Sequence, residues 1–193
     1  MQGKNIHLAA FNGSPRKDGN THHMLKRLFG PLEASGVTCE EIRIGGVAVR
    51  GCLACGTCRE HPGRCVQTED PMNEWIARML AADAIVLASP TYFANVTAEM
   101  KALIDRAGYA CVATKMLARK VGAPVAVARR GGAIQVYNAL MAFFGINEMI
   151  VPMSSYWNMG YGLEPGAVQK DAEGMRTMEK LGEQLAWLMR KLC

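Results

Sequence analysis

The feature that most constrains the fold is a turn near the N-terminus that joins an apolar run to a helical pattern. The run Ile6 to Phe11 indicates a strand, and it leads directly into the turn Asn12-Gly13-Ser14-Pro15-Arg16-Lys17-Asp18-Gly19-Asn20-Thr21. The two glycines let the backbone pass close to an anion, and the helix that follows begins with unpaired N–H groups. The stretch therefore predicts a phosphate-binding turn between a strand and a helix.

The side chains of this turn add donors suited to a phosphate monoester. Ser14, Asn20 and Thr21 carry short hydroxyl or amide groups, Gly19 permits a close approach, and Arg16 supplies a planar cation that matches phosphate oxygens. The turn contains neither the Gly-x-Gly-x-x-Gly of dinucleotide-binding folds nor the Gly-Lys-Ser/Thr of a P-loop. A phosphate such as that of FMN fits these donors; the alternative is an ordinary surface turn capped by Asn20 or Thr21.

Strand-like and helix-like segments alternate along the rest of the chain. Apolar or β-branched runs predict further strands at 38–44, 84–88, 124–128 and 149–151. Apolar residues at helical spacing predict helices over 24–32, 72–80, 100–104, 136–144 and 175–192. This alternation favours one α/β domain over residues 1–193. Right-handed crossovers then give a flavodoxin-like, doubly wound, five-stranded parallel sheet in the order 2-1-3-4-5, with helices on both faces.

Two local signals refine the helix boundaries. Gly30-Pro31 is expected to kink or end the first helix, because proline lacks the N–H that a helix interior needs. At Asp70-Pro71 a helix is expected to begin, with the aspartate as N-cap and the proline in the first helical position.

In such a sheet, ligands bind beyond the carboxyl ends of the strands at the topological switch point. The phosphate turn and the loops after the third and fourth strands would meet there. The candidate residues of the last two loops are Pro90, Thr91, Tyr92, Phe93, Ala94, Asn95, Arg130, Gly131 and Gly132. Tyr92 and Phe93 would pack near a flat heterocycle whose polar edge bonds to backbone groups of 91–96; ordinary core or surface packing is the alternative.

Composition excludes several classes of function. The net charge of +5 is mild and no run of five like charges occurs, which argues against a nucleic-acid-binding protein and fits an anionic cofactor. No apolar leader precedes the first strand, and no stretch reaches the roughly 18 apolar residues of a membrane span. A cytoplasmic location without membrane contact is therefore expected, and there the cysteines would bind metal, react with oxidants or be buried.

These motifs resemble the NADPH-dependent FMN reductase branch of the flavodoxin-like superfamily, and within it the iron-sulfur flavoproteins. The run Gly13 to Arg16 with Gly19-Asn20-Thr21 is similar to the family's FMN phosphate loop. Ser89 to Phe93 with Asn95-Val96 is similar to its isoalloxazine loop, and Lys101 with Asp105-Arg106 to the helix that follows. The resemblance covers essentially the whole chain. It implies FMN as cofactor and a homodimer or homotetramer with an active site partly built across subunits.

The loop at about 50–66 carries the motif of the subgroup. Its spacing, Cys52-x2-Cys55-x2-Cys58-x6-Cys65, resembles the compact motif whose four thiolates hold a [4Fe-4S] cluster. Two-residue gaps let one loop wrap a cluster, and the longer gap lets the fourth sulfur close the cage. Nearby arginines would offset its negative charge: Arg50, Arg59 and Arg64. A zinc site, a set of redox thiols and a vestigial motif remain alternatives.

The resemblance implies an FMN-dependent oxidoreductase that passes electrons from NAD(P)H or ferredoxin through FMN and the cluster to a small acceptor. Arg129 or Arg130 would meet a nucleotide phosphate of NAD(P)H. No catalytic acid or nucleophile is required, and His22 and His23 are expected to form a solvated surface pair. The alternatives are a plain NAD(P)H-dependent FMN or quinone reductase without a cluster, a non-catalytic flavin electron carrier, and a regulatory module that has lost its cofactor.

The segment 153–166 is expected to be a long aromatic loop. It holds Tyr156, Trp157 and Tyr161, which would fill an interface between subunits. Covering the flavin of a neighbouring subunit is the alternative role.

Overall fold

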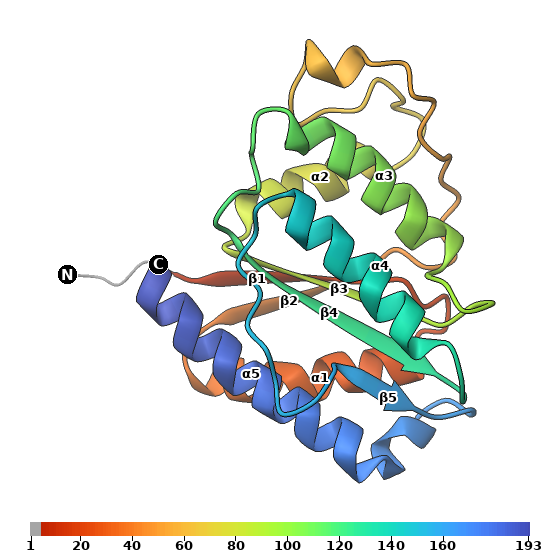
Figure 1. The fold of residues 1–193 in the computed structure, drawn as a ribbon, viewed down its shortest axis with the longest axis vertical. Helices are drawn as coiled ribbons and strands as arrows, with labels where there is room; N and C mark the ends of the chain where they lie inside the picture. The colour runs from red at the N-terminus through yellow and green to blue at the C-terminus, as the bar shows by residue number, and fades with distance from the viewer. Residues whose placement is uncertain (1–4) are drawn as a thin grey trace.

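A parallel sheet of five strands forms the middle layer of the protein in the computed structural model, which describes residues 5–193 (Figure 1). The strands are β1 (His7–Asn12), β2 (Thr38–Arg43), β3 (Ala84–Pro90), β4 (Val121–Ala128) and β5 (Met159–Tyr161). Their order is β2-β1-β3-β4-β5, and every adjacent pair is parallel. The predicted flavodoxin-like order 2-1-3-4-5 is confirmed.

Helices cover both faces of this sheet, as Figure 1 shows. The helices are α1 (Asn20–Ala34), α2 (Met72–Ala81), α3 (Ala98–Val112), α4 (Ala133–Ile146) and α5 (Ala172–Leu192), with short 3-10 turns η1 (Thr57–Arg59) and η2 (Ala167–Lys170). One core lies between the sheet and α2, α3 and α4, and a second between the sheet and the pair α1 and α5. Within residues 5–193, none of the helices combines the length and the apolar character that a bilayer crossing needs.

The central strands supply both cores because alternate residues point to opposite faces. Phe11 lies opposite Leu87 in register, and both pack in the core under α2 to α4. The preceding pair, Ala10 and Val86, packs in the core under α1 and α5. Burial on both faces explains the unbroken apolar runs of these strands, whereas the partly polar β2 forms an edge of the sheet.

The fifth strand lies later in the chain than the sequence predicts. The run 149–151 forms an isolated bridge, between Ile150 and Val121 at the start of β4, whereas β5 pairs with Ala126 to Ala128. The pairing is extended by the N–H of Ala126, which donates to the carbonyl of Asn158 at 2.9 Å. The prediction was wrong because a short apolar run does not specify which part of its neighbour it will reach. The edge strand lies instead inside the segment predicted as a loop.

Helix α1 does not end at Gly30-Pro31 but continues to Ala34. The turn that contains the proline packs closely on α5: a Cβ on Gly182 would lie 2.4 Å from the carbonyl oxygen of Leu28 and 3.2 Å from Cγ of Pro31. Packing of α1 against α5 thus outweighs the local tendency of glycine and proline to break a helix.

The predicted start of α2 is confirmed to within one residue, but Pro71 and not Asp70 holds the N-cap position. The helix begins at Met72, directly after Asp70-Pro71, and Oδ1 of Asp70 accepts the N–H of Met72 at 3.2 Å. This contact also fixes the end of the irregular stretch 50–70, called the cysteine segment below, because Asp70 is where that segment joins α2.

Candidate functional site

Two cavities hold most of the residues that the sequence singles out. The strand-end cavity, of about 160 Å³, lies beyond the carboxyl ends of the strands and is lined by Ser14, Arg16, Asn20, Thr21, Pro90, Thr91 and Tyr92, together with Val127, Ala128, Arg129, Gly162 and Leu163. The cysteine cavity, of about 140 Å³, is lined by all four clustered cysteines and by Arg106 and Tyr109 of α3. The phosphate turn and the loop after β3 therefore meet in one cavity, as predicted.

The phosphate turn is held in shape by its own polar groups. The buried Asn12 accepts the N–H of Ser14 on Oδ1 at 2.8 Å, and Oγ of Ser14 accepts the N–H of Arg16 at 3.2 Å. A Cβ on Gly19 would lie 2.9 Å from that same Oγ, so a larger residue would displace the turn. In the described chain no side chain caps the first turn of α1, which leaves its leading N–H groups available for an anion.

Gly45, which the sequence analysis did not assign, supports this turn from behind. It follows β2, and its N–H donates to the carbonyl of Asn12 at 3.1 Å. A Cβ at this position would lie 2.3 Å from the carbonyl carbon of Ser14 and 2.4 Å from the carbonyl oxygen of Gly13. The pair Gly45-Gly46 signals a turn in the sequence, but only the parallel pairing of β1 with β2 reveals that its backbone touches the phosphate turn.

The side chain of Asn20 connects the phosphate turn to the segment after β5 by two hydrogen bonds. Its Nδ2 donates to the carbonyl of Gly162 at 2.9 Å, and its Oδ1 accepts the N–H of Val168 at 3.2 Å. Gly162 has no room for a side chain, because a Cβ would lie 2.5 Å from the nitrogen of Val168. These contacts bring Gly162 and Leu163 to the cavity, an assignment that the sequence could not give without the true position of β5.

The loop after β3 forms a tight turn with an exposed aromatic at its apex. Tyr92 and Asn95 exchange backbone hydrogen bonds of 2.9 and 3.0 Å, while Phe93 and Ala94 have φ values of +49° and +57°. Two central residues with positive φ are typical of a type I′ turn, and without glycine each costs on the order of 1 kcal/mol. Phe93 is 107% exposed and Tyr92 47%, so neither side chain packs in the core.

Thr91 contributes a polar group that the protein itself leaves unsatisfied. Its Oγ1 is buried and has no hydrogen-bond partner among the described residues, although Thr91 lines the strand-end cavity. A buried hydroxyl normally has a partner, and an unpaired one costs about 1–3 kcal/mol. A ligand with a hydrogen-bonding edge would remove this cost, so the residues present fit a polar heterocycle beside the phosphate turn.

The loop after β4 contributes differently from the prediction. Arg129 lines the cavity, whereas Arg130 and Gly131 are exposed beside it. Gly132 has φ +89°, and a Cβ there would lie 2.9 Å from Cα of Ala94. Gly132 therefore supports the turn that carries Phe93 instead of lining the cavity.

His22 lies against His23, with ring centroids 5.6 Å apart, but it is not a solvated surface residue. Its Nδ1 lies 2.7 Å from Oε2 of Glu41, and both side chains are largely shielded from solvent. Oε1 of the same carboxylate accepts from Nδ2 of Asn12 at 2.7 Å. The prediction was wrong because Glu41 on β2 lies beside α1 only after the sheet has formed, and the resulting hydrogen bonds connect His22 to the phosphate turn.

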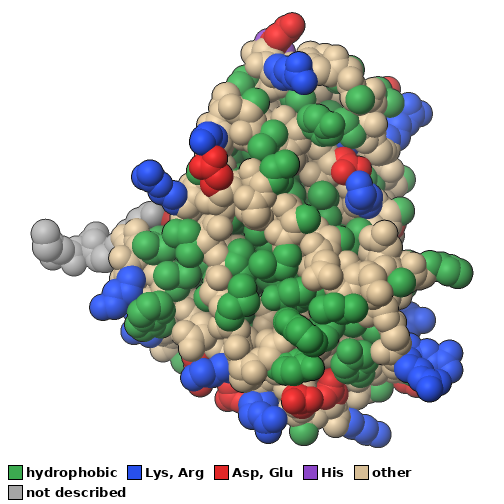
Figure 2. Space-filling model, in the orientation of Figure 1, with side chains coloured by type: hydrophobic (Ala, Val, Ile, Leu, Met, Phe, Trp, Pro, Cys, Tyr) green, Lys and Arg blue, Asp and Glu red, His purple; other side chains and the backbone are tan. Residues whose placement is uncertain are grey.

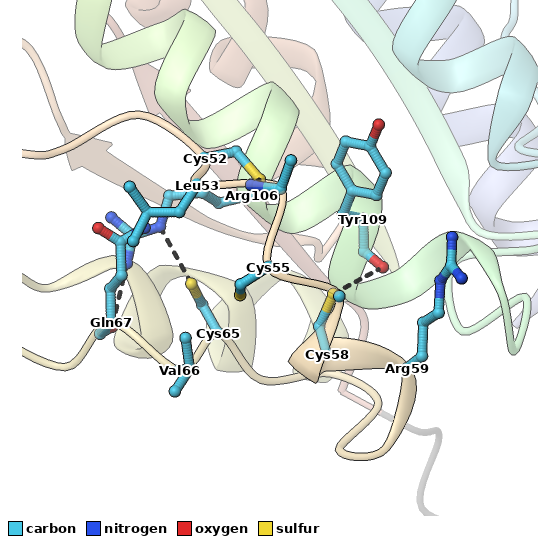
Figure 3. A pocket seen from close by; sticks show the side chains of 12 residues that line it. Cys52, Leu53, Cys55, Cys58, Arg59, Cys65, Val66, Gln67, Arg106 and Tyr109 are labelled. Carbon is cyan, nitrogen blue, oxygen red and sulfur yellow. Dashed lines mark hydrogen bonds between the residues drawn. The ribbon is translucent and has the colours of Figure 1, made fainter.

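The cysteine cavity is bounded by one irregular segment and by helix α3 (Figure 3). Sγ of Cys52 accepts the N–H of Ala54 at 3.4 Å, Sγ of Cys58 donates to the carbonyl of Tyr109 at 3.5 Å, and Nε of Arg106 donates to Sγ of Cys65 at 3.3 Å. All seven cysteines carry free thiols. Four thiols facing one cavity provide the number and type of ligands that a cluster needs.

The four sulfurs nevertheless do not form a closed set of ligands. Among residues 5–193, no three His, Cys, Asp or Glu side chains converge closely enough to hold a metal ion. The residue types and their shared cavity fit a cluster, and closing the cage requires the sulfurs to move together within that cavity. Hydrogen bonding from the side chain and backbone of Thr57 lowers the pKa of Cys55, which favours the thiolate that binds metal.

Two of the three cysteines outside this segment differ from the clustered ones in chemistry. Burial raises the pKa of Cys39 to about 12 and that of Cys111 to about 11. Both therefore stay protonated near neutral pH and are poor metal ligands. This contrast supports the sequence-based separation of the clustered cysteines from the scattered ones.

The arginine that contacts one of these sulfurs is Arg106. The sequence analysis assigned it only to the helix that follows the isoalloxazine loop. Arg106 is buried and pairs with Asp70, whereas Arg59 lines the cysteine cavity and Arg64 lines a neighbouring cavity together with Cys65. Burial alone would raise the pKa of Asp70, but hydrogen bonds from Arg106 and two backbone N–H groups hold it below its ordinary value. The sequence did contain a signal, because Arg106 lies on the apolar stripe of α3 with Leu103 and Ala107.

Part of the aromatic segment forms an exposed apolar surface. The rings of Tyr156 and Trp157 lie 4.9 Å apart and both residues are about half exposed. Hydrophobic side chains gather on the face shown in Figure 2, over the region where Figure 1 draws α4 and the connection from α4 to β5. An exposed patch of this kind is typical of an interaction surface.

Comparisons with known proteins agree with this geometry. Residues 6–164 match the family model of NADPH-dependent FMN reductases. An iron-sulfur flavoprotein of Methanocaldococcus jannaschii is 33% identical over 190 residues, which cover 95% of this chain and 97% of that protein. An iron-sulfur flavoprotein of Archaeoglobus fulgidus is 34% identical over 187 residues, which cover 90% of this chain and 76% of the relative.

Solved structures with low sequence identity share the fold. A flavodoxin, WrbA-like protein from Agrobacterium tumefaciens superposes with a TM-score of 0.67 at 16% identity, covering 98% of this chain and 99% of that one. An NAD(P)H:quinone oxidoreductase from Methanothermobacter marburgensis superposes with a TM-score of 0.68 at 16% identity, covering 94% and 97%.

Proposed function

The chain belongs to the NADPH-dependent FMN reductase family, and we propose that it works as an FMN-dependent oxidoreductase of the iron-sulfur flavoprotein type. In this proposal it passes electrons from NAD(P)H or from a ferredoxin to a small acceptor, with FMN and a [4Fe-4S] cluster as its bound groups. FMN takes up two electrons as a hydride and releases them singly, and a cluster carries one electron at a time.

The observation that carries the FMN assignment is the strand-end cavity, which offers two different kinds of polar group. Ser14, Arg16, Thr21 and the start of α1 form the side suited to the phosphate. The unpartnered hydroxyl of Thr91 and the backbone of the Tyr92–Asn95 turn form the side suited to the flavin ring. The protein's part is to bind and orient the cofactor and to exclude water, and the reaction needs no catalytic acid or nucleophile from this chain.

The cluster is assigned to Cys52, Cys55, Cys58 and Cys65. The assignment is supported by their spacing, by their position around one cavity, and by the similarity of the chain to proteins named iron-sulfur flavoproteins. The nearby cationic charge of Arg106 suits a negatively charged group of this kind. A cytoplasmic location is part of the proposal, because exposed thiols such as Cys55 stay reduced there.

The proposed partners are inferred from the charge of the protein and from its exposed apolar surface. Arg129, which lines the strand-end cavity, is assigned to a phosphate of NAD(P)H, and the net charge of +5 suits an acidic electron carrier such as a ferredoxin. The exposed surface that includes Tyr156 and Trp157 is assigned to contacts in a homodimer or homotetramer.

A second candidate is a plain NAD(P)H-dependent FMN or quinone reductase without a cluster. It is favoured by the spread of the four sulfurs, which form no metal-binding group in the described chain, and by the fold shared with an NAD(P)H:quinone oxidoreductase. In that case the cysteines would be redox-active thiols. A non-catalytic flavin carrier would bind FMN but show no steady-state turnover with either donor.

One experiment separates these candidates. The protein is purified without oxygen, its absorption spectrum is recorded, and released flavin and iron are assayed on the same sample. Flavin bands with a broad shoulder near roughly 400 nm and about four irons per chain support the proposal. Flavin without iron, even after anaerobic reconstitution with iron and sulfide, excludes the cluster, and steady-state turnover with NAD(P)H then separates the plain reductase from the carrier. A sample that binds neither group contradicts all three.

A further inference from the structure

Arg106 carries a permanent charge and yet is completely buried. The exposed fraction of its side chain is 0%, and that of its partner Asp70 is 7%. A buried charge is tolerated only where it is paired and its hydrogen-bonding groups are satisfied. The surroundings of Arg106 therefore identify what the residue is placed to hold.

All three nitrogens of the guanidinium donate to the cysteine segment, and Figure 3 draws the contact between Arg106 and Cys65. Nη1 donates to the carbonyl of Arg50 at 3.0 Å and to the carboxylate of Asp70, and Nη2 donates to the carbonyl of Gln67 at 3.0 Å. Arg50 precedes Cys52, whereas Gln67 and Asp70 follow Cys65. One side chain from α3 thus ties together both ends of the segment.

The remaining nitrogen points at a proposed ligand. Nε donates to Sγ of Cys65 at 3.3 Å, and Cys65 is the cysteine that follows the longest gap in the motif. Hydrogen bonds to cluster sulfurs and nearby positive charge both raise the reduction potential of such a centre, and they act strongly where water is excluded.

Building on the proposed function, we propose that Arg106 is the positioning residue of the cysteine segment: it closes the segment around its cavity and donates Nε–H to the sulfur of Cys65. The four contacts use donors in a fixed planar arrangement. Lysine keeps the charge but has a single nitrogen, so it cannot reach the sulfur, the carboxylate and both carbonyls together. Arg106 is no ligand itself and acts through Cys65.

The test compares Arg106→Lys with Arg27→Lys, a matched control on α1. Arg27 pairs with Glu179 on the exposed surface, and α1 covers the opposite face of the sheet from α3. In Arg106→Lys we expect normal FMN content, an apparent affinity for iron that falls by about 10-fold or more, and a more negative midpoint potential of the iron centre. Trypsin should also cleave faster after Arg59 and Arg64 in the metal-free protein. Arg27→Lys should match the wild type in every measurement.

Asp70→Asn provides a second variant with a distinct signature, which matters if Arg106→Lys folds poorly. It keeps every N–H of Arg106 but loosens the guanidinium and removes one negative charge near the cysteines. We expect faster trypsin cleavage, as in Arg106→Lys, but a midpoint potential that moves in the positive direction. General loss of stability would not move the two potentials in opposite directions.

Several outcomes would overturn the inference. Wild-type cleavage rates and iron content in both variants would show that Arg106 does not position the segment. Faster cleavage with unchanged potentials would show that it acts on the fold and not on the sulfur. If the wild type takes up no iron, the cluster assignment fails separately. In that case the inference is tested by the rates at which trypsin cleaves the metal-free wild type and variants, and equal rates would overturn it.

Discussion

The strand-end cavity takes its shape from backbone, whereas the cysteine cavity takes its shape from side chains that lie far apart in the sequence. The first is built by the phosphate turn, the start of α1 and the Tyr92–Asn95 turn, with Gly45 and Gly132 packed too closely for a side chain. The second lies under an irregular segment between β2 and α2 that Arg106 ties to α3.

This difference indicates which of the two sites is already formed before its ligand binds. The strand-end residues are carried by strands whose pairing also forms the core, so their geometry is fixed once the sheet has folded. The four cysteines line a common cavity, but within residues 5–193 their sulfurs do not yet converge. We therefore expect FMN to bind to a largely preformed site and iron to complete the structure of the cysteine segment.

Gly45→Ala should produce the largest effect and should separate the two sites. The new Cβ would lie 2.3 Å from the backbone of Ser14, so the phosphate turn must shift. We expect the free energy of unfolding to fall by about 1–3 kcal/mol or more and FMN to be largely lost, while iron uptake persists. Denaturant unfolding and the flavin-to-iron ratio measure both effects. Gly30→Ala, whose Cβ meets no described atom within 4 Å, is the matched control.

Arg16→Ala removes a cation from the phosphate side of the strand-end cavity. A hydrogen bond to a charged group contributes about 1.5–3 kcal/mol, so the Kd for FMN should rise about 10- to 100-fold. Lys17→Ala removes a neighbouring cation that does not line the cavity and is the control. Fluorescence titration of the apoprotein with FMN measures both variants, and equal losses of affinity would refute a specific role for Arg16.

Thr91→Val replaces the hydroxyl by a methyl group, so the side chain keeps nearly the same shape. It tests the part of the strand-end cavity that is assigned to the flavin ring. Because the buried hydroxyl lacks a described partner, the apoprotein should be as stable as the wild type or more stable. The Kd for FMN should nevertheless rise about fivefold, which corresponds to roughly 1 kcal/mol. Thermal unfolding with and without FMN measures both quantities. An apoprotein that loses stability would show that Thr91 has a structural partner.

The smallest effect is expected on the free energy of unfolding at acid pH. It should involve Asp70, at the end of the cysteine segment. The pKa of Asp70 in the folded protein lies below its unfolded value, so its contribution to stability is complete above about pH 4. That contribution is lost as the pH falls through the folded pKa. The difference in unfolding free energy between wild type and Asp70→Asn, measured in urea at several pH values, should therefore shrink in acid. Asp105→Asn, which removes a carboxylate from the exposed pair with Lys101, controls for the loss of charge.

The sequence predicted those parts of the fold and site that depend on local pattern. The apolar run of β3 predicted a central strand, and Gly13 to Thr21 predicted a turn beside a helix, because both signals lie within about ten residues. The order of the strands followed from the alternation of elements and the handedness of their connections. These features placed the strand-end cavity correctly.

The features that the sequence did not predict depend on contacts between distant segments. Arg106 reaches Cys65 across 41 positions, and His22 reaches Glu41 from a helix to a neighbouring strand. Gly162 reaches the cavity only because β5 lies ten residues later than the apolar run suggested. The short edge strand β5 is stabilised by its pairing with β4, and the local β propensity of residues 159–161 does not predict that pairing.

In this interpretation the chain holds two independent sites, one for FMN and one for a cluster. The most direct test assays flavin and iron on the same anaerobic samples of the wild type, of Arg16→Ala and of the double variant Cys58→Ala/Cys65→Ala. We predict both groups in the wild type, iron without a full complement of flavin in Arg16→Ala, and flavin without iron in the cysteine variant. Loss of flavin and iron together in both variants, or a wild type that binds flavin but never iron, would contradict the account.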